Sequence, residues 1–166
     1  MHKRQLLLRN EHMFVVLEKR LFMFDTGSPQ SFSSSPTITI DGRRFSLPSS
    51  YVGVTPEYVS EMIGMQTSGL LGVDILNEFD IIADVPRETI EFSSQQLDCN
   101  GTAVQLEMLL GIPIVPVRIG EAALSMLLDT GAQISYIEGE FLANCEPAGP
   151  VEDFHPMVGR FNTTTY

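Results

Sequence analysis

The sequence predicts an all-β chain made of two related lobes, and two observations lead to this prediction. Apolar segments of strand length alternate with turn-forming residues along most of the 166 residues. One pattern also occurs twice, 104 positions apart. Residues 21–28 have the sequence LFMFDTGS, and residues 125–132 have the sequence SMLLDTGA. Each copy is an apolar run that ends at Asp-Thr-Gly, where glycine permits a tight turn. Two copies predict two β lobes, with short helices, related by a pseudo-two-fold axis.

Each copy predicts a β-hairpin that carries an aspartate into a turn. The apolar stretches 13–17 and 114–119 lie upstream of the two motifs. Turn-forming residues separate each stretch from the strand that follows it, which is the pattern of two antiparallel strands. The aspartates at the ends of the second strands are Asp25 and Asp129. The sequence therefore predicts the same hairpin and turn in both lobes.

The first lobe continues with a second hairpin and a short helix. Segments 37–40 and 43–47 alternate apolar and polar residues around the dipeptide Asp41-Gly42, which favours a two-residue hairpin turn. Threonine followed by proline then predicts the N-terminus of a helix. We expect this helix to run from Pro56 to about Met62.

The rest of the first lobe predicts a strand, two helical turns and a last hairpin. The strand begins at Gly69, and Gly72 breaks it. About two helical turns are expected after that glycine, over residues 73–79. Segments 80–84 and 88–92 then predict two strands joined by a short turn that contains a proline.

A polar stretch over residues 93–101 predicts the linker between the lobes. The first lobe is therefore expected over 1–97 and the second over 98–166. In the first lobe, 47 positions separate the motif aspartate from the glycine of the apolar-apolar-Gly segment. The equivalent glycine of the second lobe would lie near position 176, so the second lobe is expected to be incomplete.

The second lobe continues with a short helix and a loop. Residues 137–144 predict the helix and 147–150 the loop. The segment 149–161 that follows contains aromatic side chains and glycine.

Charge and composition exclude several classes of function. Lys and Arg number 10 and Asp and Glu number 21, a net charge of −11 that would repel nucleic acid and anionic membranes. No apolar run approaches the roughly 20 residues of a membrane span, and no export signal is visible, so a cytoplasmic chain is expected. The two cysteines and three histidines are scattered, so neither a metal nor another cofactor is expected.

If the two turns meet at the pseudo-two-fold axis, Asp25 faces Asp129. Two carboxyl groups at such a short distance cannot both ionise readily, so they share a proton and titrate as a coupled pair. One then serves as a base and the other as an acid. The competing interpretation is two ordinary turns, since Asp, Thr and Gly are common turn formers. The matching strands favour the pair, and the nearby Asp74 and Asp80 are expected to cap a helix or to face solvent.

The two motifs resemble those of the retropepsin-like and pepsin-like aspartic proteases, whose mark is an apolar pair followed by Asp-Thr-Gly and then Ser or Ala. Residues 70–76, with their Leu-Leu-Gly, resemble the family's second signature, the strand beneath the catalytic turn. Both motifs in one chain resemble a fused retropepsin dimer, and the resemblance covers nearly the whole first lobe. It implies the retropepsin-like acid protease fold, proteolysis by an aspartic endopeptidase, and a polypeptide substrate bound in an extended conformation.

The resemblance also implies roles for the residues of the two turns. Asp25 and Asp129 would be the catalytic pair that activates a water molecule for peptide hydrolysis. Thr26 and Thr130 would cross-brace the two turns by hydrogen bonds. No cofactor and no metal would take part in this reaction.

The resemblance also implies a hairpin flap that covers the cleft. Nine residues separate Gly27 from the next hairpin, which leaves little room for a flap in the first lobe. Residues 149–161 of the second lobe are suited to a mobile flap, so a single flap built by the second lobe is expected.

The residues that follow the threonines would support the site. Gly27 and Gly131 would give the backbone of the substrate close access. The hydroxyl of Ser28 could donate a hydrogen bond to the outer oxygen of Asp25 and help to hold it ionised. Ala132, at the matching position of the second turn, has no side chain that could do the same.

Two alternatives stay open. A chain with this fold could be a non-catalytic peptide-binding or assembly module, because a fold by itself does not determine a function. The chain could also form a homodimer in which the Asp25 turns of two copies make the pair and Asp129 is unused. Substitution of each aspartate by asparagine distinguishes these alternatives from the intramolecular pair.

Overall fold

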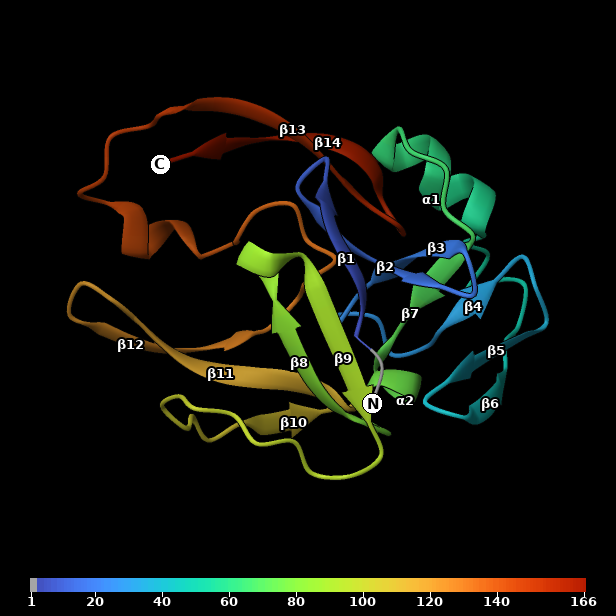
Figure 1. Ribbon diagram of the computed structural model, residues 1–166. Helices are drawn as coiled ribbons and strands as arrows, with labels where there is room; N and C mark the ends of the chain where they lie inside the picture. The colour runs from blue at the N-terminus through green and yellow to red at the C-terminus, as the bar shows by residue number, and fades with distance from the viewer. Residues whose placement is uncertain (1–2) are drawn as a thin grey trace. The chain divides into compact units, whose positions relative to one another are not determined.

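The computed structural model describes residues 3–166, and it is mostly β with few helices (Figure 1). The all-β prediction is therefore confirmed. The chain divides into two compact units, Met1–Ala132 and Gln133–Tyr166. The lobes expected over 1–97 and 98–166 follow the sequence repeat and stay a prediction. Within residues 3–166, no helix is long and apolar enough to cross a membrane.

The largest sheet of the first unit has seven strands. They are β1 (Arg4–Arg9), β2 (His12–Leu17), β3 (Arg20–Phe24), β4 (Phe32–Ser33), β7 (Gly69–Leu71), β8 (Asp80–Asp84) and β9 (Thr89–Ser93). In space they follow the order β4-β7-β3-β2-β1-β9-β8 (Figure 1). Every neighbouring pair is antiparallel except β3 and β7, which run in the same direction. The parallel pair brings the end of β7 beside the end of β3, where Asp25 begins its turn.

Two-residue turns connect β1, β2 and β3. Asn10 and Glu11 join β1 to β2, and Glu18 and Lys19 join β2 to β3. All four residues have positive φ, between 48° and 66°. Two consecutive residues of this kind match the right-handed twist of a strand pair. The hairpin predicted before Asp25 is therefore confirmed.

The hairpin and the capped helix predicted between residues 37 and 64 are also confirmed. The strands β5 (Thr37–Ile40) and β6 (Arg43–Ser46) turn at Asp41 and Gly42, whose φ values are 47° and 78°. The helix α1 (Pro56–Ile63) begins after Thr55, whose side-chain oxygen accepts from the N–H of Tyr58 at 3.2 Å. It ends at Gly64, which adopts the left-handed region with φ 68°.

The helical segment after β7 is shorter than predicted. The helix α2 (Val73–Leu76) has four residues, whereas the sequence predicts about two turns. The chain leaves the helix early because Phe79 enters the core and β8 already begins at the next residue. The strands β8 and β9 are joined by the 3₁₀ turn η1 (Val85–Arg87), so the predicted hairpin is confirmed.

The second copy of the motif forms a three-stranded sheet of the same design. Its strands are β10 (Glu107–Leu109), β11 (Ile112–Ile119) and β12 (Ala122–Leu127), in that order. Leu110 and Gly111 make the first turn with φ values of 53° and 84°, as Asn10 and Glu11 do between β1 and β2. In the described part of the chain, β12 pairs with β11 alone, whereas β3 pairs with both β2 and β7.

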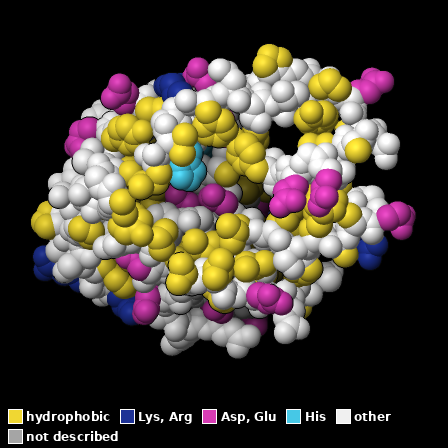
Figure 2. Space-filling model, turned by 180° about the vertical axis from the view of Figure 1, so that it is seen from behind, with side chains coloured by type: hydrophobic (Ala, Val, Ile, Leu, Met, Phe, Trp, Pro, Cys, Tyr) yellow, Lys and Arg dark blue, Asp and Glu magenta, His cyan; other side chains and the backbone are white. Residues whose placement is uncertain are grey.

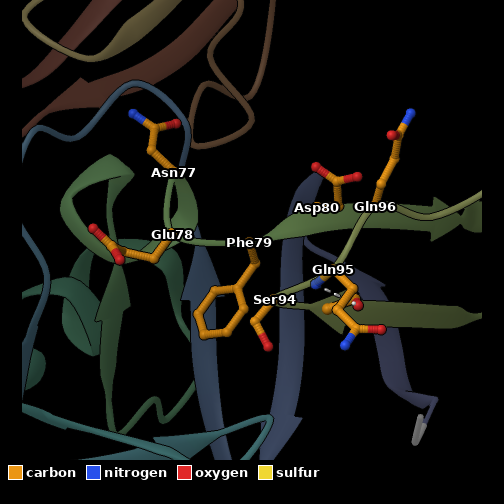
Figure 3. A pocket seen from close by; sticks show the side chains of 8 residues that line it. Asn77, Glu78, Phe79, Asp80, Ser94, Gln95 and Gln96 are labelled. Carbon is orange, nitrogen blue, oxygen red and sulfur yellow. Dashed lines mark hydrogen bonds between the residues drawn. The ribbon is translucent and has the colours of Figure 1, made fainter.

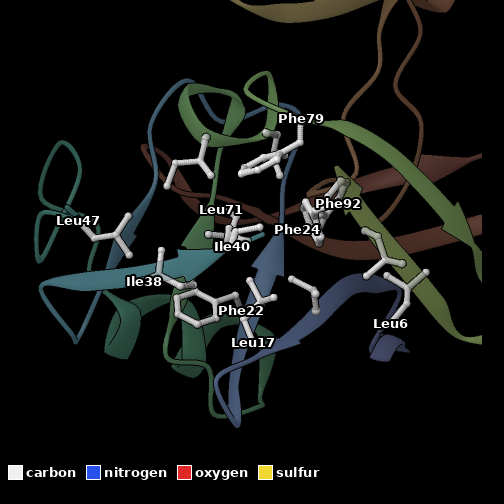
Figure 4. Packing of buried hydrophobic residues seen from close by; sticks show 14 residues of the cluster. Leu6, Leu17, Phe22, Phe24, Ile38, Ile40, Leu47, Leu71, Phe79 and Phe92 are labelled. Atoms are coloured by element: carbon white, nitrogen blue, oxygen red, sulfur yellow. The ribbon is translucent and has the colours of Figure 1, made fainter. Parts of the chain in front are cut away.

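The core of the first unit combines side chains of the seven-stranded sheet, the β5–β6 hairpin and α2 (Figure 4). The rings of Phe79 and Phe92 meet edge to face with centroids 5.9 Å apart, and Phe24 contacts Phe92 at 6.4 Å. Burial of one such side chain contributes about 1.5–3 kcal/mol. Because Phe24 belongs to this core, the core fixes the end of β3 directly before Asp25.

The second unit contains one hairpin and one 3₁₀ turn. The hairpin strands β13 (Gly149–His155) and β14 (Gly159–Thr165) pair over their whole length. The short helix predicted over 137–144 is present only as the 3₁₀ helix η2 (Gly139–Leu142), in which glycine disfavours an α-helix. The loop predicted over 147–150 is also too long, because β13 already begins at Gly149. The function of the hairpin as a flap stays a prediction.

One partly buried hydrogen bond anchors this hairpin within the second unit. The hydroxyl of Tyr136 donates to the carboxylate of Asp153, a buried residue of β13, and the Tyr136 ring contacts Phe161 of β14. Burial, with the hydrogen bond to Asp153, raises the pKa of Tyr136 to about 12. Tyr136 therefore stays protonated over the physiological range and keeps its donor.

Ion pairs lie on the surface and contribute little to the fold. Figure 2 shows acidic side chains spread among hydrophobic ones on one face, which fits the net charge of −11. The pairs formed by Arg43 with Glu78 and by Arg160 with Glu152 are all half exposed. Exposed pairs of this kind contribute about 0–1 kcal/mol each. The stability of the first unit therefore comes mainly from its apolar core.

We expect Gly72→Ala to destabilise the first unit by about 1–3 kcal/mol through overpacking. A Cβ at this position would lie 2.6 Å from the carbonyl oxygen of Ser28 and 2.9 Å from the carbonyl carbon of Gln30, both backbone atoms. Gly101→Ala is the matched control, since nothing lies within 4 Å of a Cβ there. Urea unfolding followed by circular dichroism measures both variants. Equal unfolding midpoints would contradict the close contact between Gly72 and the turn that follows Asp25.

Candidate active site

Two backbone turns, one from each copy of the motif, face each other and exchange hydrogen bonds. The N–H of Thr26 donates to Thr130 Oγ1 at 3.1 Å, and the N–H of Thr130 donates to Thr26 Oγ1 at 3.0 Å. Each hydroxyl also donates to the opposite strand end. Thr26 Oγ1 donates to the carbonyl of Leu128 at 2.5 Å, and Thr130 Oγ1 to that of Phe24 at 2.7 Å. These four bonds join β3 to the end of β12 across 104 positions of sequence.

The two carboxyl groups lie against the glycines of the opposite turns. A Cβ added to Gly27 would overlap the carboxyl group of Asp129, and one added to Gly131 would overlap that of Asp25. Each carboxylate also accepts from its own turn, where the N–H of Gly27 donates to Asp25 Oδ1 and that of Gly131 to Asp129 Oδ1, both at 2.8 Å. Glycine is required at both positions because any side chain would displace the carboxyl groups.

Asp25 holds its proton more tightly than an ordinary aspartate. It is half-buried, and burial raises its pKa most. The negative charge of Asp129 and a hydrogen bond with its side chain raise the pKa further, to about 7, against the opposing effect of two backbone N–H donors. Asp129 itself is exposed. Burial and the neighbouring charge therefore keep Asp25 protonated in weakly acidic solution.

Ser28 contacts Asp25 through its backbone and not through its hydroxyl. Its N–H donates to Asp25 Oδ1 at 3.0 Å, whereas its hydroxyl donates to the carbonyl of Gln30 at 3.1 Å. The predicted hydroxyl bond is therefore wrong, because the turn brings the Gln30 carbonyl within reach of that side chain. The N–H of Ser28 does lower the pKa of Asp25, but burial and the charge of Asp129 outweigh this effect. Ala132 occupies the matching place after the second turn.

A polar network behind the first turn connects it to β7 and α2. Asp74 Oδ1 accepts from the N–H of Ser31 at 2.8 Å and from its hydroxyl at 2.6 Å, and Ser31 Oγ accepts from the N–H of Gly72 at 2.8 Å. The N–H of Val73 donates to the carbonyl of Ser28 at 2.9 Å. Asp74 Oδ1 also accepts from the N–H of Ile75 in the first turn of α2 at 3.0 Å, although the N-cap residue itself is Gly72. No local signal predicts this network, because its members are brought together from segments about 40 positions apart.

His12 also belongs to the site, although the sequence does not single it out. Its side chain is 3% exposed, and its Nδ1 lies 3.0 Å from the carbonyl oxygen of Gly131. A carbonyl can only accept, so Nδ1 carries the hydrogen and donates. His12 begins β2, and 119 positions separate it from Gly131. Its position near the N-terminus, beside polar residues of a turn, is typical of a surface histidine, and only the folded chain shows the contact.

Other clusters of polar groups in the first unit do not include the aspartate pair. A pocket of about 380 Å³ lies elsewhere (Figure 3). Its lining residues are Asn77, Glu78, Phe79, Asp80, Ser93, Ser94, Gln95 and Gln96. In this pocket, Asp80 Oδ2 accepts a hydrogen bond from the N–H of Leu97 at 3.0 Å. Within residues 3–166, no group of three or more His, Cys, Asp or Glu side chains could hold a metal ion.

All eight predicted site residues lie in the two facing turns. They are Asp25, Thr26, Gly27, Ser28, Asp129, Thr130, Gly131 and Ala132. Comparisons with protein-family models, with curated proteins and with solved structures found no match. A functional conclusion therefore rests on the geometry and chemistry of these turns.

We expect Thr26→Val and Thr130→Val to be coupled in their effect on stability. Each removes one acceptor and one donor of the crossed bonds, and it leaves a backbone N–H without its partner. Each single variant should lose about 1–3 kcal/mol, and the double variant should lose less than their sum. Thr164→Val, at an exposed threonine of β14, is the control. Strict additivity in chemical denaturation would count against the crossed arrangement.

We expect the stability of the chain to fall as pH rises from about 4 to 7, and Asp25→Asn to remove part of this fall. The pKa of Asp25 is raised from 3.8 to about 7, so in this window the folded chain keeps a proton that the unfolded chain releases. The effect is about 1–3 kcal/mol, which corresponds to a few degrees in Tm.

Thermal unfolding of both proteins at pH 4.5, 6 and 7.5 measures this difference. Tm of the native chain should decline relative to Tm of Asp25→Asn as pH rises. Asp98→Asn, at an exposed aspartate, should keep the native slope. Parallel curves for the native chain and Asp25→Asn would show that Asp25 does not hold a proton in this range.

Proposed function

We propose that the chain is an aspartic endopeptidase with a retropepsin-like fold. One observation carries this proposal: two copies of one motif bring two carboxyl groups within hydrogen-bond reach of each other, and burial and the charge of Asp129 raise the pKa of Asp25. Structural turns have no need of such an arrangement, since it places like charges together and raises the free energy of the ionised pair. Perturbed carboxyl pairs of this kind are typical of acid–base catalysis.

The proposed reaction is the hydrolysis of a peptide bond by a water molecule held between the two carboxyl groups. The ionised Asp129 takes a proton from the water, and the water oxygen forms a bond to the carbonyl carbon. The protonated Asp25 gives its proton to the carbonyl oxygen, which yields a tetrahedral diol. Asp129 then gives its new proton to the amide nitrogen while Asp25 takes a proton from a hydroxyl of the diol. The C–N bond breaks, an amine and a carboxylic acid are released, and both carboxyl groups return to their starting state.

The assignment of acid and base follows from the unequal surroundings of the two aspartates. Asp25 is half-buried and its pKa of about 7 keeps it protonated in weakly acidic solution. Asp129 is exposed, and an exposed carboxylate is well solvated in its charged form. In the proposed enzyme Asp25 is therefore the acid of the first step and Asp129 the base.

An extended polypeptide is the substrate that this site fits best. The glycines of both turns have no side chains that could cover the carboxyl groups. The backbone of a substrate could therefore approach these groups closely. An extended peptide presents a carbonyl and an N–H at each residue, and it can pair with strands while its side chains alternate between pockets. This supports an endopeptidase rather than an enzyme for a small molecule.

We expect peptide-library cleavage by the chain, and a loss of at least about a hundredfold in both Asp25→Asn and Asp129→Asn. Each variant removes one of the two proton carriers and keeps the shape of the side chain. The assay is run from pH 3 to pH 8 with cleavage products measured by mass spectrometry. Cleavage should decline above pH 7, because Asp25 then loses its proton.

The two variants distinguish the alternatives. Loss in Asp25→Asn with full activity in Asp129→Asn would support a homodimer that pairs the Asp25 turns of two copies. Peptide binding without cleavage in all three proteins would support a binding or assembly module. Asp98→Asn serves as the charge-matched control and should cleave like the native chain.

A further inference from the structure

The two turns of the candidate active site are supported in different ways. The first rests on β7 and α2, since the carbonyl of Leu71 accepts from the N–H of Asp25 at 3.0 Å and the carbonyl of Ser28 accepts from the N–H of Val73 at 2.9 Å. The strand β12 has no neighbour corresponding to β7 in the described part of the chain. The second turn therefore depends on contacts of another kind.

Gly131 is the point at which the second turn meets both carboxyl groups. Its N–H donates to Asp129 Oδ1 at 2.8 Å. Its Cα faces the carboxyl group of Asp25 so closely that a Cβ there would overlap that group. A small displacement of Gly131 would therefore change the surroundings of both aspartates together.

His12 holds the carbonyl of this same glycine. Its ring is buried, and its Nδ1–H donates to the Gly131 carbonyl at 3.0 Å. We propose that His12 is a positioning residue of the active site, which fixes Gly131 and through it the separation of the carboxyl groups of Asp25 and Asp129. The catalytic consequence rests on the proposed peptidase function, whereas the positioning can be tested without it.

A comparison of the two repeats shows that, within residues 3–166, only the second turn, which contains Gly131, has a histidine contact of this kind. His12 is the first residue of β2 after the turn Asn10–Glu11, and Ile112 is the first residue of β11 after the turn Leu110–Gly111. Both follow two residues of positive φ and pair with the last residue of the preceding strand. The isoleucine side chain has no donor, so it cannot hold the carbonyl of Gly27 in the corresponding way.

The chemistry that this position requires is a donor at the place of Nδ1. The neutral Nδ1–H tautomer and the imidazolium both donate from this nitrogen, so the contact does not require a particular charge on the ring. Asparagine places its amide nitrogen near the position of Nδ1, two bonds from Cβ. Glutamine places its amide one bond further out, near the position of Nε2. The pair His12→Asn and His12→Gln therefore compares two polar amides that differ in reach.

The experiment compares the native chain with His12→Leu, His12→Asn and His12→Gln. The first readout is the pKa of Asp25, from the pH dependence of its carboxyl carbon signal in the NMR spectrum of the labelled full chain. In His12→Leu and His12→Gln we expect this pKa to fall by at least half a unit, because the second turn moves away from Asp25. His12→Asn should stay close to the native value. His155→Asn is the control, since this histidine is exposed on β13.

The second readout is the rate of peptide cleavage. We expect kcat to fall about tenfold to a hundredfold in His12→Leu and His12→Gln with KM nearly unchanged, and His12→Asn to recover most of it. An unchanged pKa of Asp25 in folded His12→Gln would overturn the proposal. If even the native chain fails to cleave peptides, the proposed function fails, but the NMR comparison still decides whether His12 positions the pair.

Discussion

The crossed hydrogen bonds of Thr26 and Thr130 are the constraint on which the candidate site depends. Two ionised carboxylates about 4 Å apart in a partly buried site repel each other by about 4 kcal/mol at an effective dielectric constant of 20. The four bonds between the turns contribute about 1 kcal/mol each, which is of the same size. A proton shared by Asp25 and Asp129 removes most of the repulsion. The threonines and the shared proton together therefore make the close approach of the carboxyl groups stable.

The geometry of the strands explains why the constraint can be met at all. Both β3 and β12 are second strands of hairpins whose turns are short, so each ends at a defined place. Core packing at Phe24 fixes the end of β3, and β7 adds a parallel neighbour that accepts from the N–H of Asp25. Glycine at positions 27 and 131 then leaves space for the opposite carboxyl group. Loss of any one of these features would separate the turns.

Local features of the fold could be predicted from the sequence, and contacts between distant segments could not. The Asp41-Gly42 turn and the capped start of α1 depend on neighbouring residues, and the structure has them as predicted. The length of α2 and the restriction of the helix near Gly139 to a 3₁₀ turn depend on competition with following strands and on packing. Propensity alone cannot decide such a competition, because its outcome is set by tertiary contacts.

The same division holds for the candidate site. The sequence repeat alone predicts that Asp25 and Asp129 are equivalent members of a pair, because both follow the same motif. It cannot predict which groups surround each of them. The Ser28 hydroxyl donates to Gln30, and Asp74 accepts from Ser31 as well as from its own helix. Both contacts depend on which donor or acceptor the folded backbone brings within hydrogen-bond distance, and sequence spacing does not contain that information.

Differences between the two repeats are what allow an acid and a base to be assigned. A pair with exact two-fold symmetry would hold its proton equally on either side, and neither carboxyl group would have a fixed role. In this chain one turn is backed by β7 and accepts two backbone N–H bonds at Asp25, whereas the other is exposed and is held by His12. The N–H donors favour the ionised form of Asp25, yet its pKa is raised, so burial and the neighbouring charge outweigh them. Asp25 therefore keeps its proton on the better supported and less solvated side of the pair, and the proposed roles of acid and base rest on this difference.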